Sequence, residues 1–200
     1  MDQSTSRAAV RAFPRFVAAA ALGLAACGPS EREVRVQPAP GESYVLTDVE
    51  ISSIMMNANN GEIQAGQLAL QKSRNDAVRQ FAQRMITEHT TLNQMISPHM
   101  DRRNRTDMRD GMGARGPISQ QLSSNNQRTL HVLQQLEGAQ FDRTYMQNQV
   151  AQHEWLLNTL DDALIPGADD NALERDLREA RDMVASHLQQ ARQIRGSMGR

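Results

Sequence analysis

The sequence predicts an all-α fold, and within that class a ferritin-like antiparallel four-helix bundle with an additional crossover helix. Aromatic residues make up only 4% of the chain, whereas it holds 11 Met. A core built from aliphatic side chains and Met suits packed helices. No segment alternates β-branched and polar residues as a strand would, and four long segments carry apolar residues at helical spacing. Plain up-down packing of the same helices is the alternative.

The N-terminal segment has the form of a bacterial lipoprotein signal. Three arginines precede a short apolar stretch that ends in Leu-Ala-Ala before Cys27, the only cysteine. The stretch is too short to cross a bilayer, so we predict a signal peptide over residues 1–26 and lipidation of Cys27. An ordinary cleaved signal is the alternative. Because Gly28 rather than Asp follows Cys27, we expect an outer-membrane lipoprotein of the bacterial cell envelope that faces the periplasm.

The rest of the chain divides into a tether and one domain. Residues 27–46 contain three prolines among charged residues without apolar periodicity, which predicts a flexible tether. Residues 47–197 should form the bundle. The net charge of −1 and the absence of basic clusters predict no nucleic-acid partner, and the mean hydropathy of −0.60 predicts no further membrane span. The membrane is therefore reached through the lipid alone, and protein partners are not predicted.

The first helix is expected over residues 47–73. Thr47-Asp-Val-Glu50 has the pattern of a capping box, in which a hydroxyl and a carboxylate satisfy the first backbone N–H groups. Asn59-Asn-Gly-Glu62 offers a second start, so a break or kink is predicted near Gly61.

The second helix should begin after a capping Asn75 and be disturbed at Pro98, with a loop over residues 102–116. His99, beyond the proline, is expected at the surface.

The crossover helix should run from Pro117 to about residue 137, where Gly138 ends it. His131 lies off its main apolar stripe and is expected at the surface. A further helix over residues 140–164 is stopped by Pro166-Gly167. Asp170 or Asn171 opens the last helix, whose apolar residues recur four and three positions apart.

Three histidines lie on apolar stripes, each near the middle of a different long helix. With a rise of about 1.5 Å per residue, His89 and His153 lie about 20 Å from the starts of their helices, and His187 lies about 15 Å from the end of its own. If the last helix runs opposite to the other two, the three imidazoles share one layer. Glu62 lies on the apolar stripe of the first helix at a comparable height.

A carboxylate and three imidazoles in one buried layer predict a metal site formed by Glu62, His89, His153 and His187. Burial disfavours the charged forms, and a divalent metal would satisfy all four groups. This donor set suits iron, zinc, copper or manganese. The alternative is a structural polar layer in which these groups bond one another, Tyr145, Gln149 or water, in a non-catalytic interaction or stress-protective protein.

Catalytic signatures are scarce. Di-iron bundles use Glu-x-x-His pairs, and no glutamate here has His three residues later. Glu88 and Glu154 directly precede His89 and His153, so we expect them at the flank of the layer. No nucleophile elbow or phosphate loop is present, and no catalytic residue is predicted. The sequence favours a protein that is not an enzyme. Met85 and Met183 each lie four residues before a core histidine. Thioether and imidazole groups are copper ligands, so copper handling is a further alternative.

Several segments together resemble the bacterial envelope family called domain of unknown function 4142, over roughly residues 47–194. This resemblance implies an architecture similar to ferritin-like bundles in a family often labelled outer-membrane or exported, without an assigned activity. Where the family usually has Asp before its first histidine, this chain has Glu88. The segments that carry the resemblance are Glu62-Ile63, Leu68–Lys72, Phe81–His89, Gly138–Asp142, Tyr145, Val150–His153 and His187-Leu188.

Overall fold

The structure is a computed structural model that describes residues 46–107 and 117–198, with side chains for 46–100 and 118–198. The predicted signal peptide, Cys27 and all of the predicted tether except Leu46 lie outside the described residues. Within the described part every regular element is a helix, which confirms the all-α prediction. None of these helices combines the length and apolar character needed to cross a membrane.

Helix α1 (Asp48–Lys72) begins at the predicted capping box. The Thr47 backbone N–H donates to Glu50 Oε2 over 2.9 Å, and the Glu50 N–H donates to Thr47 Oγ1 over 3.3 Å. The predicted break near Gly61 is wrong, because α1 is continuous. A Cβ at Gly61 would overlap the side chain of Asn126 on α3 (Pro117–Gln134). This glycine therefore makes room for a neighbouring helix.

Helix α2 (Asp76–Asp107) is capped by Asn75 as predicted, since the Ala77 N–H donates to Asn75 Oδ1 over 3.0 Å. The sequence predicts that Pro98 disturbs this helix and that a loop follows from residue 102. This is wrong, because the helix continues past the proline to residue 107. The predicted loop therefore begins later than residue 102, and residues 108–116 lie outside the described part. A proline removes one backbone donor, and packing of the following turn offsets that loss.

That packing involves His99, which was expected at the surface. Its side chain is buried, and its Nε2 lies 2.7 Å from Asp176 Oδ2 of α6 (Asn171–Ser197). The prediction is wrong because it assumed that the disturbance at Pro98 would turn the following residues away from the core. His131 is exposed, as predicted.

Helix α3 starts at the predicted proline and ends three residues before the predicted position. Lys72 Nζ donates to the carbonyl oxygens of Gln134 and Leu136 over 2.7 and 2.9 Å, which satisfies acceptors at this helix end. Helix α4 (Gly138–Thr159) is prolonged by the π-helical turn η1 (Leu160–Leu164) and by α5 (Ile165–Gly167). The chain thus leaves the helix at the predicted Pro166-Gly167.

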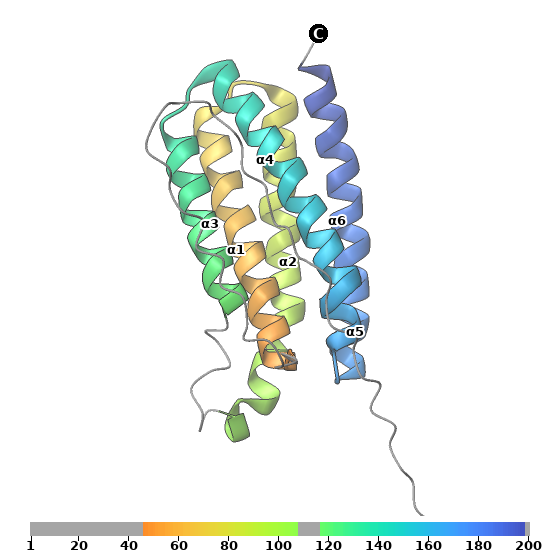
Figure 1. The fold of residues 1–200 in the computed structure, drawn as a ribbon. Coiled ribbons are helices and arrows are strands. Elements are labelled where there is room, and N and C mark those ends of the chain that lie inside the picture. Colours follow the sequence, from red (N-terminus) through yellow and green to blue (C-terminus); the bar gives the residue numbers. More distant parts are fainter. Residues whose placement is uncertain (1–45, 108–116, 199–200) are drawn as a thin grey trace, which may run out of the picture. The chain divides into compact units, whose positions relative to one another are not determined.

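The helices form two antiparallel hairpins, α1 with α2 and α4 with α6 (Figure 1). Helix α3 lies along α1 and carries the chain back along the bundle, with Asn126 Nδ2 donating to the Asn57 carbonyl over 3.0 Å. Consequently α2 and α4 run parallel, and α6 runs opposite to both. This arrangement agrees with the predicted crossover, and kinship with ferritin-like proteins stays a prediction.

The core is divided into two apolar clusters by a polar layer. Ile51, Leu92 and Leu177 belong to the cluster near the start of α1. Phe81 and Phe141 belong to the cluster near its end. The layer between them consists of buried polar side chains: Asn59, Glu62, His89, Gln149, His153 and His187. Because buried polar groups are costly unless they are paired, the partners of this layer decide what the fold can do.

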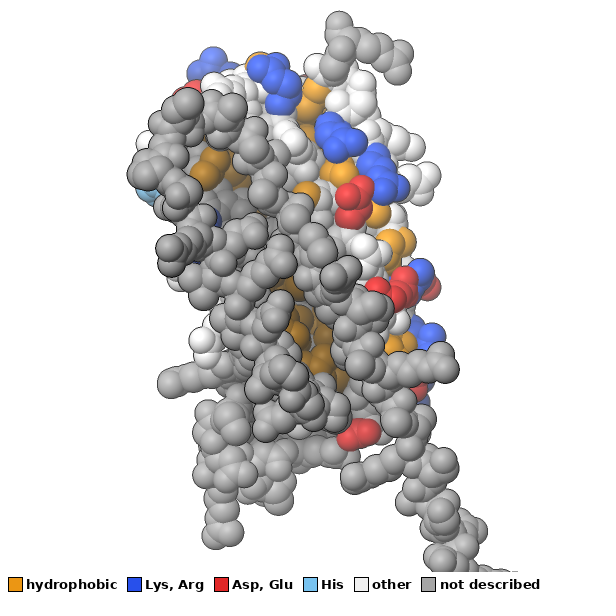
Figure 2. Space-filling model, in the orientation of Figure 1, with side chains coloured by type: hydrophobic (Ala, Val, Ile, Leu, Met, Phe, Trp, Pro, Cys, Tyr) orange, Lys and Arg blue, Asp and Glu red, His pale blue; other side chains and the backbone are white. Residues whose placement is uncertain are grey.

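Basic and acidic side chains alternate down the α6 side of the face shown in Figure 2. Arg181 pairs with Asp161 at 2.5 Å, and Arg192 pairs with Glu154 at 2.7 Å. Such exposed pairs are screened by solvent, so they add little to the stability that the core provides.

Candidate metal centre

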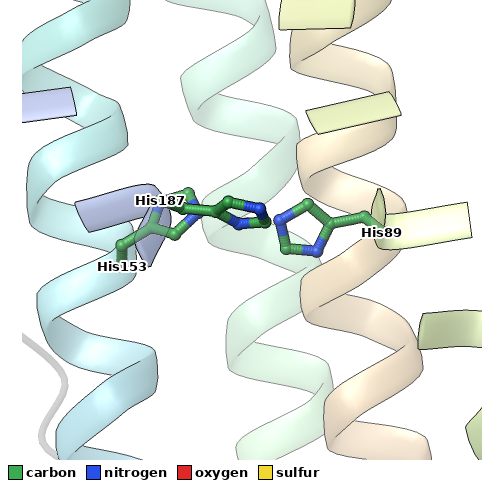
Figure 3. Close-up of side chains that lie close together, drawn as sticks. All are labelled: His89, His153 and His187. Carbon is green, nitrogen blue, oxygen red and sulfur yellow. The ribbon is translucent and has the colours of Figure 1, made fainter. Parts of the chain in front are cut away.

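The three predicted histidines meet inside the bundle, one from each of α2, α4 and α6 (Figure 3). His89 and His187 are fully buried, and His153 is 1% exposed. One ring nitrogen from each lies within 4.8 Å of the other two. The ring centroids are 5.2–5.7 Å apart. The antiparallel course of α6 brings His187 to the height of the other two, as the sequence predicted.

Each ring uses its outer nitrogen for a hydrogen bond to an oxygen acceptor. His153 Nδ1 lies 2.8 Å from the backbone carbonyl of Gln149, and His187 Nε2 lies 2.5 Å from Glu88 Oε2. His89 Nδ1 lies 3.0 Å from Asn59 Oδ1. A carbonyl or carboxylate oxygen can only accept, so the outer nitrogen of each ring carries the proton.

The orientation of the Asn59 amide, on which the tautomer of His89 depends, follows from its other partners. Asn59 Nδ2 donates to Asn93 Oδ1 over 2.9 Å, and Asn93 Nδ2 donates to Asn60 Oδ1 over 2.8 Å. This chain of amides ends at the exposed side chain of Asn60. With its nitrogen used in this way, Asn59 presents its oxygen to His89.

The inner nitrogens are His89 Nε2, His153 Nε2 and His187 Nδ1. All three are buried and have no hydrogen-bond partner among the described residues. Because the outer nitrogens hold the protons, each inner nitrogen has a free lone pair. Figure 3 shows the rings turned toward one another. The structure therefore brings one ring nitrogen from each of three histidines to one point.

Burial favours the neutral form of His89 and His187. It lowers the pKa of His89 well below the usual histidine value, and the charges of His153 and His187 lower it further. Burial and the His153 charge also lower the pKa of His187 to about 4, although the bond to Glu88 acts in the opposite direction. At neutral pH the lone pairs of these two rings are available to a metal ion.

Glu88 holds His187 from outside the layer. Partial burial tends to raise the pKa of Glu88, but hydrogen bonds from Arg84 and His187 outweigh this and lower it. Arg84 Nε donates to Glu88 Oε1 over 2.9 Å, and Arg84 Nη1 donates to Gln190 Oε1 of α6 over 2.8 Å. Carboxylate–histidine pairs of this kind orient metal ligands in known sites.

Glu62, the fourth predicted ligand, is buried beside this group and is not part of it. Its Oε2 accepts a hydrogen bond from Gln149 Nε2 over 2.6 Å. Burial raises the pKa of Glu62, while the His153 charge and the Gln149 hydrogen bond lower it to a lesser extent. A small opening of about 10 Å³ reaches both Glu62 and His153 from outside; its other lining residues are Ala58, Gln152, Trp155 and Leu156.

Sequence reasoning missed two supporting residues. Asn59 was interpreted as part of a helix start, although it lies three residues before Glu62 and thus on the same helical face. Glu88 was placed at the flank, because it points about 100° away from His89 on its own helix. That direction leads to His187 on α6, a contact that the sequence of α2 alone does not reveal.

The chain matches a known protein family over most of its length. The family described as "Domain of unknown function (DUF4142)" matches residues 34–194, which include all four predicted ligands. No curated protein and no solved structure matches the chain.

Proposed function

The chain belongs to the domain of unknown function 4142 family, whose description assigns no activity, and from the geometry of the site we propose that the protein binds a divalent transition-metal ion through His89, His153 and His187. The observation that carries this proposal is the set of three inner nitrogens that converge without partners. Three buried acceptors facing one another are unfavourable unless a cation or a donor lies between them.

The arrangement outside the rings supports the same conclusion. In metal sites, a ligating histidine usually donates its second N–H to a carboxylate or carbonyl, and this bond fixes the ring and its tautomer. Here Glu88 accepts this hydrogen bond from His187, and the Gln149 carbonyl accepts it from His153. The side-chain oxygen of Asn59 accepts it from His89.

Imidazole donors favour zinc, copper or iron over magnesium and calcium, and manganese remains within the predicted set. Three protein ligands leave a coordination position open, so a bound ion could act as a Lewis acid toward a small ligand. A ligand role for Glu62 stays a prediction, since its carboxylate is engaged with Gln149.

The experiment is a measurement of metal content on the full chain after reconstitution with iron, zinc, copper or manganese. We expect about one ion per chain in the native protein and in His131→Ala, a matched control whose histidine is exposed. The double variant His153→Ala and His187→Ala should lose the ion and, by circular dichroism, remain helical. If the native protein holds no stoichiometric metal with any of the four ions, the proposal is wrong.

The rival function is a non-catalytic envelope protein in which the polar layer only fixes helix register. Hydrogen bonding at the outer nitrogens fits both functions. In a purely structural layer, water or another donor would have to satisfy the three inner nitrogens, so the metal-content measurement distinguishes the two functions.

We also propose that the protein is anchored to the envelope by a lipid on Cys27, with the bundle in the periplasm. The support is the basic and apolar N-terminal segment that ends in Leu-Ala-Ala before this cysteine. A metal site on such an anchor would be held at the inner face of the outer membrane.

A further inference from the structure

A second cluster of buried polar groups lies beside the three histidines. It consists of Glu62 on α1 with Tyr145 and Gln149 on α4, and we call it the Glu62 cluster. Gln149 links it to the histidines, because its side chain donates to Glu62 and its backbone carbonyl accepts from His153. Tyr145 lies one helical turn from Gln149 and thus on the same face of α4, and the charge of Glu62 acts on its hydroxyl.

Two polar atoms of this cluster lack partners. The Tyr145 hydroxyl and Gln149 Oε1 are both buried, and neither has a hydrogen-bond partner in the described part of the chain. Tyr145 and Gln149 are fully buried. Burial raises the pKa of Tyr145 well above its usual value, and the nearby charge of Glu62 raises it further, so the hydroxyl keeps its proton. The cluster thus offers a donor at Tyr145 and an acceptor at Gln149.

The donor at Tyr145 and the acceptor at Gln149 restrict which molecules could bind. An occupant that satisfies both atoms must accept a hydrogen bond from Tyr145 and donate one to Gln149. Halides and azide cannot donate, and dioxygen neither donates nor accepts strongly. The opening that reaches Glu62 holds about 10 Å³, which is close to the space of one water molecule. A molecule of about this size fits beside Glu62.

We propose that Glu62, Tyr145 and Gln149 form a binding subsite for a small hydroxylic molecule, water or hydrogen peroxide, next to the three-histidine centre. This inference rests on the proposed function, because the subsite would hold the small molecule that fills the open coordination position of a bound metal ion. A small opening lies beside one member of the cluster, because Glu62 lines it together with His153.

The first test is crystallographic and uses the full chain without metal, with metal, and with metal after a soak in hydrogen peroxide. We expect one ordered oxygen within hydrogen-bond distance of Tyr145 Oη and Gln149 Oε1 in the metal-free protein. Elongated density after the soak would identify peroxide, and unchanged density would identify water. An empty cluster in maps that resolve ordered water elsewhere would overturn the proposal.

The second test uses Tyr145→Phe, which removes only the hydroxyl. If an occupant bridges Tyr145 and Gln149, the variant loses a hydrogen bond and its melting temperature falls, by about 2–4 °C for a domain of this size. If the hydroxyl is unpartnered in solution, its removal relieves a buried polar group and the melting temperature rises, which would refute the subsite. Phe141→Leu, in the same apolar cluster, controls for packing.

The two proposals fail separately. Metal binding without density in the Glu62 cluster would remove the subsite and leave the metal centre. An occupied cluster in a protein that takes up no metal would remove the metal centre and leave a buried hydration site. Tyr145→Phe should leave metal stoichiometry unchanged, because the hydroxyl is not among the converging nitrogens.

Discussion

Glu88 and Glu154 form a matched pair, since each precedes a core histidine by one residue. Glu88 bonds to His187, whereas Glu154 pairs with Arg192 at the surface. We predict that Glu88→Gln weakens metal affinity about 10-fold, because it removes the charge that orients and polarises His187. Glu154→Gln should change the affinity less than twofold. Competition titration against a chelator measures both, and equal affinities would contradict the role given to Glu88.

The histidines also predict how stability depends on pH in the metal-free protein. The pKa of His187 is lowered to about 4 in the fold, and that of His89 is lowered as well, whereas unfolded histidine titrates near 6.5. The unfolded state therefore binds more protons between these values, and stability should fall as the pH drops from about 6.5 toward 4.

Urea titrations at a series of pH values measure this effect. His187→Asn should have a smaller loss of stability over the same pH range, because one of the titrating groups is gone. His131→Asn, at an exposed position, should keep the native dependence. A native protein with constant stability from pH 7 to 4 would show that these rings are not held neutral.

At this scale the sequence predicted the three histidines and not their partners. Periodicity places His89, His153 and His187 on core faces, and helix length gives their heights. The partner of each outer nitrogen depends on how neighbouring helices are rotated, which the sequence of one helix does not fix. His99 shows the same limit, because its burial depends on Asp176 of another helix.

Gly66 sets the spacing between α1 and α2. A Cβ at this position would lie 3.0 Å from the Ala82 carbonyl oxygen and 3.0 Å from Ile86 Cγ1. Alanine is favoured over glycine in a helix by about 1 kcal/mol, but overpacking against a backbone atom costs about 1–3 kcal/mol. We predict that Gly66→Ala lowers the free energy of unfolding by roughly 1 kcal/mol.

Gly196→Ala is the control, because a Cβ there would meet no atom within 4 Å. This variant should be neutral or slightly stabilised by helix propensity. Denaturant unfolding of both variants measures the difference. If Gly66→Ala is as stable as Gly196→Ala, the two helices adjust to the methyl group and the contact is not restrictive.

Helix starts were predictable because caps are local. Thr47, Asn75 and Asp170 accept backbone N–H groups only two or three residues away, and each opens a helix in the structure. Gly61 and Pro98 misled the prediction, since packing against α3 and α6 outweighs the local tendency to break. The π-helical turn η1 could not be predicted from the spacing of apolar residues. It is a single irregular turn at the end of a long helix whose apolar residues otherwise recur at helical spacing.

For the whole molecule, lipidation is the prediction that most changes where the site would act. In a bacterial host fed labelled palmitate, the native chain should carry the label and sediment with the outer membrane. Cys27→Ser should lose both, whereas Gly28→Asp should keep the label and move to the inner membrane. An unlabelled native chain, recovered in the soluble fraction, would contradict the anchor.

The order of elements and their connectivity were predictable at this scale, because four long apolar stripes and a shorter fifth leave few ways to bury their faces. The division of the core into two apolar clusters was not. It arises where Asn59 and Gln149 join the histidine layer, and the sequence indicates that layer without showing how the apolar side chains divide on its two sides.

The three converging imidazoles belong to helices that are distant in the sequence, so no contiguous peptide of this chain holds the full ligand set. An extended chain would therefore have no high-affinity chelate to offer. If the proposed metal site is real and the polypeptide crosses a membrane before it folds, the ion would have to bind afterwards, and its identity would be decided by what the destination compartment supplies.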